Sequence, residues 1–350
     1  MSAKIVLLPG DGIGPEVIES AVKVLREAAK IESFRIELQQ GWIGGAAYER
    51  CGQPLDPATL ERCLSADAVL LGAVGGPRWD KLPGAERPEA GLLQLRKALG
   101  VFANLRPVKA RPVLAERTPY RSEILSGVDC VMVRELTGGL YFGEKHTDGE
   151  SATDQCVYHR YEIERVTRVA AELARTRRKK LTSIDKANVL ETSRLWRKTV
   201  TELVERDYPD LTLEHILVDA AAMYLAQRPS SFDVLLTENL FGDVLSDQSS
   251  TLAGSLGLLP SASLGGSVGL YEPIHGSAPD IAGKGIANPV GAILSVALML
   301  RYSLARDSLA QRVESAVEQV LAAGYLTADL HPQRPVLTND FTEAVCAALG

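Results

Sequence analysis

The sequence predicts an α/β fold with a largely parallel sheet, and two observations support this. Short, almost continuously apolar runs alternate with longer helical patterns along most of the 350 residues, as in sheets that are buried on both faces. Hydrophobic residues make up 46% and charged residues 23% of the chain, the proportions of a globular protein rather than a disordered or fibrous one. The length corresponds to roughly two domains.

The individual elements follow from these patterns. Strands are expected at residues 4–8, 68–71, 129–133, 181–184, 213–218 and 234–236, and helices at 161–177, 189–206 and 241–256. A further helix should follow the first strand, because Pro15 fits the first helical turn, where its missing N–H costs no bond. The apolar run 290–300 is too short to cross a bilayer and is expected to form a buried helix. The last helix should begin near Thr338.

Composition and cysteine spacing exclude several classes of protein. The net charge of −6, from 38 basic and 44 acidic residues, argues against a nucleic-acid partner. The five cysteines are scattered without a CxxC pair, which argues against a disulfide framework or a zinc site, so they are expected to be reduced and buried. Only four consecutive apolar residues precede Pro9. A signal peptide is therefore not expected, and we expect a soluble cytoplasmic protein without a membrane partner.

The glycine-rich motif Gly10–Glu16 follows the first strand and precedes a helix. It does not fit the dinucleotide-binding fingerprint GxGxxG, because Pro15 stands where the last glycine is needed. It also lacks the GK[ST] ending of a P-loop. Two interpretations remain, a tight strand-to-helix turn and a helix amino terminus that helps to hold an anion.

Three arginines could bind carboxylates. Arg96 lies in a helical pattern, Arg106 follows in ANLRP, and Arg134 ends the apolar run VDCVMVR. A single arginine is usually a solvated surface charge, but a charge at the end of a buried strand needs a partner or a ligand. Because the guanidinium fork matches a carboxylate, three such forks could hold a substrate with two carboxylates.

Three aspartates form a candidate site for a hard metal ion. Asp219 ends the apolar run LEHILVD, and Asp243 and Asp247 lie four residues apart, on one face of a helix. Carboxylates without histidine or cysteine suit Mg²⁺ or Mn²⁺. The same spacing also fits a capping aspartate and an exposed helix face. Lys186 follows another apolar run and is either a surface charge or a base, while Tyr141 is either a proton donor or a packing residue.

Two irregular segments complete the candidates. The glycine-rich stretch 272–288 carries His275, Asp280 and Asn288, and these could bind a nucleotide, with Asp280 accepting bonds from a ribose diol and repelling a 2′-phosphate. An ordinary surface loop is the alternative. Residues 138–158 interrupt the helical rhythm and could form a loop or an arm that pairs with a partner chain.

Together these segments resemble the isocitrate/isopropylmalate family of β-decarboxylating dehydrogenases over nearly the whole chain. The resemblance is carried by LPGDGIGPE, VLLGAVGGPRWD, GLLQLRKALGVFANLRP, VRELTGGLYFGE, DKANVL, NLFGDVLSD, GSLGLLPSAS and HGSAPDIAGKGIANP. It implies a two-domain, non-Rossmann α/β fold with mixed sheets flanked by helices. A discontinuous, cofactor-binding domain would contain residues 1–101 and 254–350. A dimerisation domain would contain residues 102–253, with an arm at about 138–158.

The resemblance also implies roles for individual residues. The implied catalytic residues are Tyr141 and Lys186. The implied metal ligands are Asp219, Asp243 and Asp247. The implied substrate-binding residues are Glu89, Leu92, Arg96, Arg106, Arg134 and Asp219. The implied cofactor-binding residues are Gly76, His275, Gly276, Ser277, Ala278, Asp280, Ile281 and Asn288. Lys186 and Asp219 would reach the site of a partner subunit, so a homodimer is expected.

The implied reaction is the NAD-dependent oxidative decarboxylation of 3-isopropylmalate to 4-methyl-2-oxopentanoate and CO₂, a step of leucine biosynthesis, with Mg²⁺ or Mn²⁺. Leu92 and Leu93 would form an apolar wall for the isopropyl group, where an isocitrate enzyme is expected to carry a polar residue. Rival interpretations are a sibling enzyme for D-malate, tartrate or homoisocitrate, a Mg²⁺-dependent hydrolase that uses the three aspartates, and a binding protein without activity.

Overall fold

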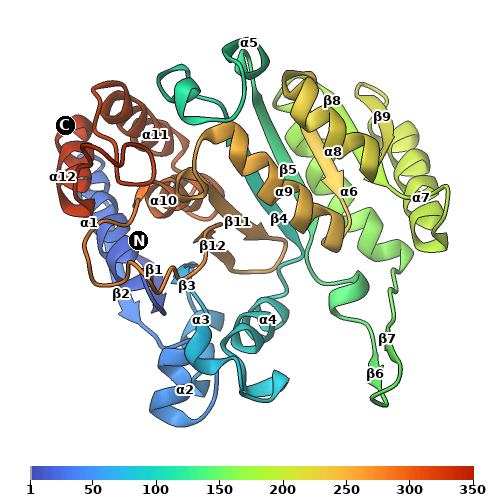
Figure 1. The fold of residues 1–350 in the computed structure, drawn as a ribbon, viewed down its shortest axis with the longest axis horizontal. Coiled ribbons are helices and arrows are strands. Elements are labelled where there is room, and N and C mark those ends of the chain that lie inside the picture. The colour runs from blue at the N-terminus through green and yellow to red at the C-terminus, as the bar shows by residue number, and fades with distance from the viewer. Residues whose placement is uncertain (1) are drawn as a thin grey trace. The chain divides into compact units, whose positions relative to one another are not determined.

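The computed structural model describes residues 2–350, which form two compact units. Unit 1 contains the residues up to Val101 together with Ser255–Gly350, and unit 2 contains Phe102–Gly254. In Figure 1, unit 1 carries the blue and red ends of the chain and unit 2 the green and yellow middle. Every described helix is too short or too polar to cross a membrane.

Unit 1 is built around five strands in the order β2-β1-β3-β12-β11. Its elements are β1 (Ser2–Gly10), α1 (Gly14–Ile31), β2 (Arg35–Gln40), α2 (Gly45–Cys51), α3 (Pro57–Leu64), β3 (Ala68–Ala73), α4 (Pro88–Leu99), β11 (Pro260–Leu264), β12 (Gly269–Pro273), α10 (Val290–Tyr302), α11 (Asp307–Ala322) and α12 (Thr338–Leu349). Neighbouring strands are parallel except for the antiparallel pair β11 and β12.

The helices of unit 1 are explained by their apolar faces. Helix α1 begins with Pro15 in its first turn and buries Val17, Val24 and Leu25, at the spacing of one helix face. Helix α10 is buried from Val290 to Leu300, because it packs against β11, β12, α1 and α11. The apolar run 290–300 is thus a buried helix, as predicted.

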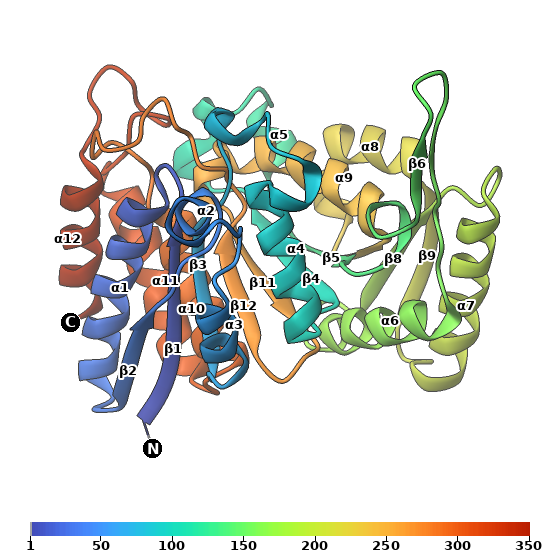
Figure 2. The same cartoon turned by 90° about the horizontal axis from the view of Figure 1, so that it is seen from below.

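Unit 2 has its own five strands in the order β4-β5-β10-β8-β9, of which only β4 and β5 pair antiparallel. Its elements are β4 (Ala103–Lys109), α5 (Ser122–Leu125), β5 (Asp129–Glu135), β6 (Lys145–Thr147), β7 (Ala152–Asp154), α6 (Arg160–Arg175), β8 (Lys180–Asp185), α7 (Glu191–Asp207), β9 (Thr212–Leu217), α8 (Val218–Gln227), β10 (Val234–Thr237) and α9 (Asn239–Ala253). Helices α8 and α9 lie on one side of these strands and α6 on the other (Figure 2).

The mixed α/β architecture predicted from the sequence is confirmed. Within residues 138–158, β6 and β7 form an exposed antiparallel hairpin. Its turn is organised by Asp148, whose carboxylate accepts the N–H groups of Glu150 and Ser151. All five cysteines are free, but only Cys63 and Cys130 are buried. The expectation of burial is wrong for Cys51 and Cys156, which are exposed, and Cys346 is only partly buried.

Candidate active site

Unit 2 gathers five of the predicted residues into one group, which we call the arginine–aspartate cluster. Its members come from β4, from the end of β5, from the short 3-10 helix Gly139–Tyr141 and from α9. They are Arg106, Arg134, Tyr141, Asp243 and Asp247. The parallel pairing of β5 with β10 brings the end of β5 beside the start of α9, so residues more than a hundred positions apart meet.

Arg134 is the most deeply buried member of the cluster, with 4% of its surface exposed. Its Nε and Nη2 both donate to Oδ1 of Asn239, at 3.0 and 2.8 Å. Its Nη1 donates to Oδ1 of Asp243. A buried guanidinium without such partners would be strongly destabilising, and these contacts hold the fork in one orientation.

Arg106, on β4, lies close to both Asp243 and Asp247. Its Nε donates to Oδ1 of Asn104 at 2.7 Å and its Nη1 to Oγ of Ser246 at 2.6 Å. Its guanidinium nitrogens lie 3.7 Å from a carboxylate oxygen of Asp243 and 3.6 Å from one of Asp247. Two cations and two carboxylates therefore share one site.

Tyr141 completes the cluster as a potential proton donor. Its hydroxyl donates to Oδ2 of Asp243 at 2.9 Å, and its ring lies 5.8 Å from the Arg134 guanidinium carbon. Burial, and then the bond to Asp243, raise the pKa of the Tyr141 hydroxyl above its usual value. The phenol consequently stays protonated at neutral pH.

Lys186 and Asp219 form a separate ion pair. The Lys186 Nζ donates to Oδ1 of Asp219 at 2.5 Å, and this bond lowers the pKa of Asp219. Lys186 directly follows β8 and Asp219 lies in the first turn of α8, after the neighbouring parallel strand β9. The strand predicted at 213–218 therefore ends one residue early, at Leu217, and Asp219 lies in a helix rather than at the end of that strand.

The three predicted metal ligands are not assembled within one chain. Across residues 2–350, no group of three or more histidine, cysteine, aspartate or glutamate side chains is arranged to hold a metal ion. Asp243 and Asp247 lie together on α9, whereas Asp219 is paired with Lys186.

The predicted cofactor residues of the stretch 272–288 lie in unit 1, as does Gly76. Nδ1 of His275 bonds to the carbonyl of Gly276 at 2.9 Å, so Nδ1 carries the hydrogen. Nε2 is then a buried acceptor without a partner in the described residues. Burial lowers the pKa of the His275 imidazole, which keeps the ring neutral.

The rest of this stretch forms a turn followed by an anchored asparagine. The Ile281 N–H donates to the carbonyl of Ala278 at 3.1 Å, and Asp280 between them is exposed. The Asn288 amide donates to Oδ2 of Asp329 at 2.9 Å. Space for a ligand exists at Gly276, where an added Cβ would meet nothing within 4 Å.

Helix α4 of unit 1 carries the remaining predicted residues. Arg96 forms an ion pair with Glu272 of β12 at 2.8 Å, and both side chains are largely buried. The Nε of Arg96 is buried without a partner in the described residues. Leu92 is partly exposed and Leu93 is exposed, while Glu89 lies close to Gly75.

Sequence reasoning missed Asn239 and Asp11. Asn239 accepts both Arg134 bonds, and its Nδ2 donates to the carbonyl of Gly138 at 3.1 Å, in the segment that leads to Tyr141. The only signal was a polar residue at the beginning of a helix, which is typical of an ordinary cap. Asp11, inside the glycine-rich motif, is a buried carboxylate that accepts three backbone N–H groups.

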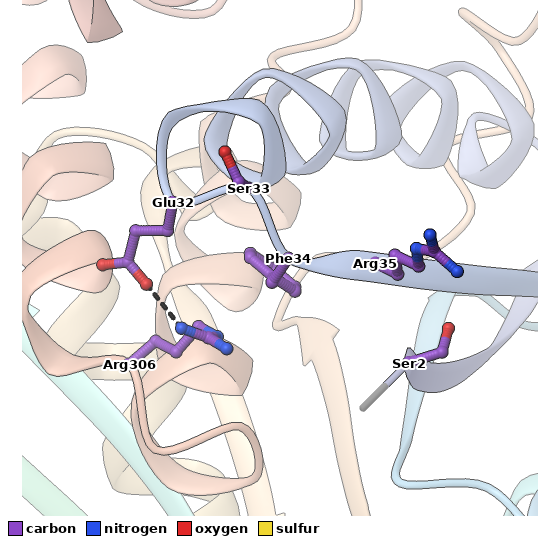
Figure 3. Close-up of a pocket in the computed structure, with 6 residues that line it drawn as sticks. All are labelled: Ser2, Glu32, Ser33, Phe34, Arg35 and Arg306. Atoms are coloured by element: carbon purple, nitrogen blue, oxygen red, sulfur yellow. Dashed lines mark hydrogen bonds and ion pairs between the residues drawn. The ribbon is translucent and has the colours of Figure 1, made fainter.

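A surface pocket of about 430 Å³ in unit 1 contains none of the predicted site residues (Figure 3). Its Arg306 is already engaged, because it donates to Glu32 at 2.6 Å and lies over the ring of Phe34 at 4.4 Å. The ion pair between Arg306 and Glu32 therefore connects the end of α1 to the beginning of α11. The pocket is therefore not the candidate active site.

The donor groups fit a divalent cation and a nucleotide. Asp243 and Asp247 offer carboxylate oxygens, the ligands that Mg²⁺ and Mn²⁺ prefer, beside arginines that suit an anionic substrate. In unit 1, the unpartnered Nε2 of His275 and the open space at Gly276 offer an acceptor and room for a ligand.

Comparisons with known proteins identify the family. The family model described as isocitrate/isopropylmalate dehydrogenase matches residues 4–345. The 3-isopropylmalate dehydrogenase of Moorella thermoacetica is 56% identical over 94% of this chain and 93% of its own length. That of Bacillus subtilis is 54% identical over 100% of this chain and 98% of its own length.

Solved structures agree with this result. The isocitrate dehydrogenase of Methylococcus capsulatus matches with a TM-score of 0.89 and 37% identity, over 99% of both chains. The β-decarboxylating dehydrogenase of Thermococcus kodakarensis matches with a TM-score of 0.83 and 36% identity, over 99% of this chain and 96% of that one. The resemblance seen in the sequence is thereby confirmed. The chain belongs to the isocitrate/isopropylmalate dehydrogenase family of oxidoreductases, whose members use a nucleotide cofactor and a divalent metal.

Proposed function

We propose that this enzyme catalyses the NAD-dependent oxidative decarboxylation of 3-isopropylmalate to 4-methyl-2-oxopentanoate and CO₂, the reaction of leucine biosynthesis. The observation that carries the proposal is the arginine–aspartate cluster, where Arg106 and Arg134 meet Asp243, Asp247 and Tyr141. The names of relatives that are more than half identical over the full chain support the choice of substrate.

The arginines would bind the two carboxylates of the substrate. Arg106 and Arg134 present guanidinium forks next to a carboxylate pair, so an anionic substrate can replace part of their contact with Asp243 and Asp247. Arg96 is proposed as the third carboxylate-binding arginine, with Leu92 and Glu89 of the same helix bordering the substrate. The apolar side chain of Leu92 suits an isopropyl group rather than a third carboxylate.

Asp243 and Asp247 would hold Mg²⁺ or Mn²⁺, together with Asp219 of the partner subunit. When bound, the cation supplies positive charge that stabilises developing negative charge on the substrate oxygens.

Lys186 and Tyr141 would move the protons. Lys186 would take the proton of the C2 hydroxyl as C2 is oxidised, and the nicotinamide, when bound, would supply the hydride acceptor. After C3 loses CO₂, Tyr141 would donate its proton to C3. The raised pKa of Tyr141 supports this role, because the phenol is protonated at neutral pH and poised to donate.

We infer a homodimer in which Lys186 and Asp219 of the partner subunit complete each site. Within one chain this pair is distinct from the arginine–aspartate cluster. Large apolar side chains are exposed close to Lys186 in the sequence and on helices α8 and α9. The exposed fraction is 62% for Val189, 45% for Met223 and 61% for Val244. Such surfaces are typical of interfaces, and the exposed hairpin of β6 and β7 would extend the contact.

Cofactor binding is assigned to unit 1. Gly76 and residues 275–288 would contact the dinucleotide, with His275, Gly276, Ser277, Ala278, Ile281 and Asn288 around it. Asp280 would accept bonds from the ribose diol and repel a 2′-phosphate, which favours NAD over NADP.

Product analysis tests the reaction. Purified protein with 3-isopropylmalate, NAD and Mg²⁺ should form NADH and 4-methyl-2-oxopentanoate in equal amounts. Asp243→Ala should form neither. NADH without the decarboxylated acid, or no consumption of 3-isopropylmalate by the wild type, would contradict the proposal.

A mixing experiment tests the shared site. Lys186→Ala and Tyr141→Phe are each expected to be inactive as pure homodimers. If Lys186 acts in the partner's site, a heterodimer of the two variants has one intact site. Random exchange of equal amounts should then restore about a quarter of wild-type activity. No recovery in exchanged mixtures would show that each chain uses its own lysine.

A further inference from the structure

The motif Gly10–Glu16 has no part in the chemistry proposed above, yet it contacts the proposed cofactor loop directly. Glu16 lies in the first turn of α1, and its two carboxylate oxygens accept the backbone N–H groups of Gly283 and Gly285, the second at 3.1 Å. Both glycines have positive φ values, +75° and +65°. One side chain thus fixes two left-handed turn positions that lie far away in the sequence.

The same motif holds the loop at a second point. The Ile13 N–H donates to the carbonyl of Ser277 at 2.8 Å. Gly12, at φ +58°, lies so close that an added Cβ would be 1.9 Å from this carbonyl oxygen. Contacts at Ser277 and at Gly283 therefore bracket residues 278–282, which carry the exposed Asp280.

The charge at this helix end differs from that of an anion-binding motif. Glu16 places a carboxylate in the first turn of α1, and the Asp11 carboxylate is buried just before the helix, where it accepts the N–H groups of Gly45, Ala46 and Gly75. Both carboxyl groups are thus engaged by backbone N–H groups outside α1. The motif therefore holds neighbouring loops together, and two acidic side chains at this helix end make it a poor site for a further anion.

We propose that Glu16 is a positioning residue for the nucleotide cofactor: it clamps Gly283 and Gly285 and so holds the loop 277–288 in its binding conformation. This inference rests on the proposed binding of NAD by that loop. Glu16 touches no reacting atom in this scheme. Removal of the Glu16 carboxylate should weaken cofactor binding and leave the KM for the hydroxy acid unchanged.

Three variants separate this role from a general structural one. Glu16→Ala removes both acceptors, and Glu16→Gln keeps one acceptor oxygen and turns an N–H donor toward the other glycine. Glu19→Ala, one turn along the same helix, is the control, because Glu19 is exposed and its carboxylate forms an ion pair with Lys23 of the same helix at 3.7 Å. The readouts are NADH affinity by fluorescence titration, amide hydrogen exchange of residues 277–288 without ligand, and separate KM values for NAD and hydroxy acid.

Glu16→Ala should weaken NADH binding at least about tenfold, Glu16→Gln roughly threefold, and Glu19→Ala less than about twofold. Exchange across 277–288 should be faster in both Glu16 variants, and the KM for the hydroxy acid should change less than about twofold. If Glu16→Ala fails to fold, Glu16→Gln decides the matter by the same readouts.

Failure of this inference and failure of the proposed function give different results. Wild-type NADH affinity or unchanged exchange in the Glu16 variants would overturn the clamp while NAD binding stands. A wild-type protein that binds no NADH would overturn the cofactor assignment, and the clamp's role in cofactor binding with it.

Discussion

Asn239 offers the sharpest test of how the arginine–aspartate cluster is held. The replacement residue, leucine, has a side chain of similar size but no hydrogen-bonding group, and the position is 1% exposed. Three bonds are lost, two from Arg134 and one to the carbonyl of Gly138. Each bond from the charged Arg134 is assigned about 1.5 kcal/mol, the low end of the range for charged groups because Arg134 keeps Asp243, and the bond to Gly138 about 1 kcal/mol. The expected loss of folding free energy is therefore roughly 4 kcal/mol.

Urea unfolding of unit 2 can measure this loss. Of the three tryptophans, Trp196 is buried in unit 2, so its fluorescence in a Trp42→Phe, Trp79→Phe background reports on that unit. All proteins are compared at one concentration, because subunit association would shift apparent stability. Asn239→Asp keeps an acceptor for Arg134 but replaces the donor to Gly138 with a second carboxylate oxygen, so its loss should be smaller than that of Asn239→Leu.

Asn339→Leu is the matched control, since Asn339 is an exposed asparagine in the first turn of α12 whose side chain accepts a long bond from Lys23 at 3.4 Å. It should change stability by less than about 0.5 kcal/mol. If Asn239→Leu costs no more than this control, the bonds around Arg134 do not hold the cluster and the reasoning is refuted.

Three further predictions concern catalysis, cofactor choice and pH. Lys186→Ala should nearly abolish turnover while NADH titration shows wild-type affinity, and wild-type turnover in this variant would rule out the proposed base. Asp280→Lys should raise kcat/KM with NADP relative to NAD, because the repelling carboxylate is replaced by a cation; an unchanged ratio would remove Asp280 from cofactor selection. Burial raises the pKa of Glu135 in the folded protein above its unfolded value of 4.5, so its contribution to stability is present below that value and is lost as the pH rises through the folded pKa. The Tm of the wild type relative to Glu135→Gln should therefore fall as the pH rises above 4.5, and a constant difference would contradict the burial effect.

Strands with continuous apolar sequence were predictable, and others were not. Strands β3, β5 and β10 are buried over most of their length and consist mainly of apolar residues. Strand β11 (Pro260–Leu264) is equally buried but consists largely of small and polar residues, because it packs against α10 at close range. Strand β2 is half exposed. Local hydrophobicity therefore does not distinguish either of them from a loop.

The sequence indicates which types of residue form the candidate site, but it does not indicate which residues they bond to. A buried arginine at the end of a strand, such as Arg134, must have a partner, yet nothing local indicates Asn239. Lys186 and Asp219 pair because β8 and β9 are neighbours in the sheet, and strand order is a property of the whole fold. The same holds for Glu16, whose partners are 267 and 269 residues away.

The most direct test of the account is a comparison of NADH or NADPH formation with 3-isopropylmalate, D-malate, isocitrate and tartrate, each with NAD and with NADP, in the presence of Mg²⁺. The account predicts rapid turnover with 3-isopropylmalate and NAD, and far lower kcat/KM with every other pair. Preference for another acid would contradict the role given to Leu92, preference for NADP would contradict that of Asp280, and no turnover with any pair would contradict the proposed reaction.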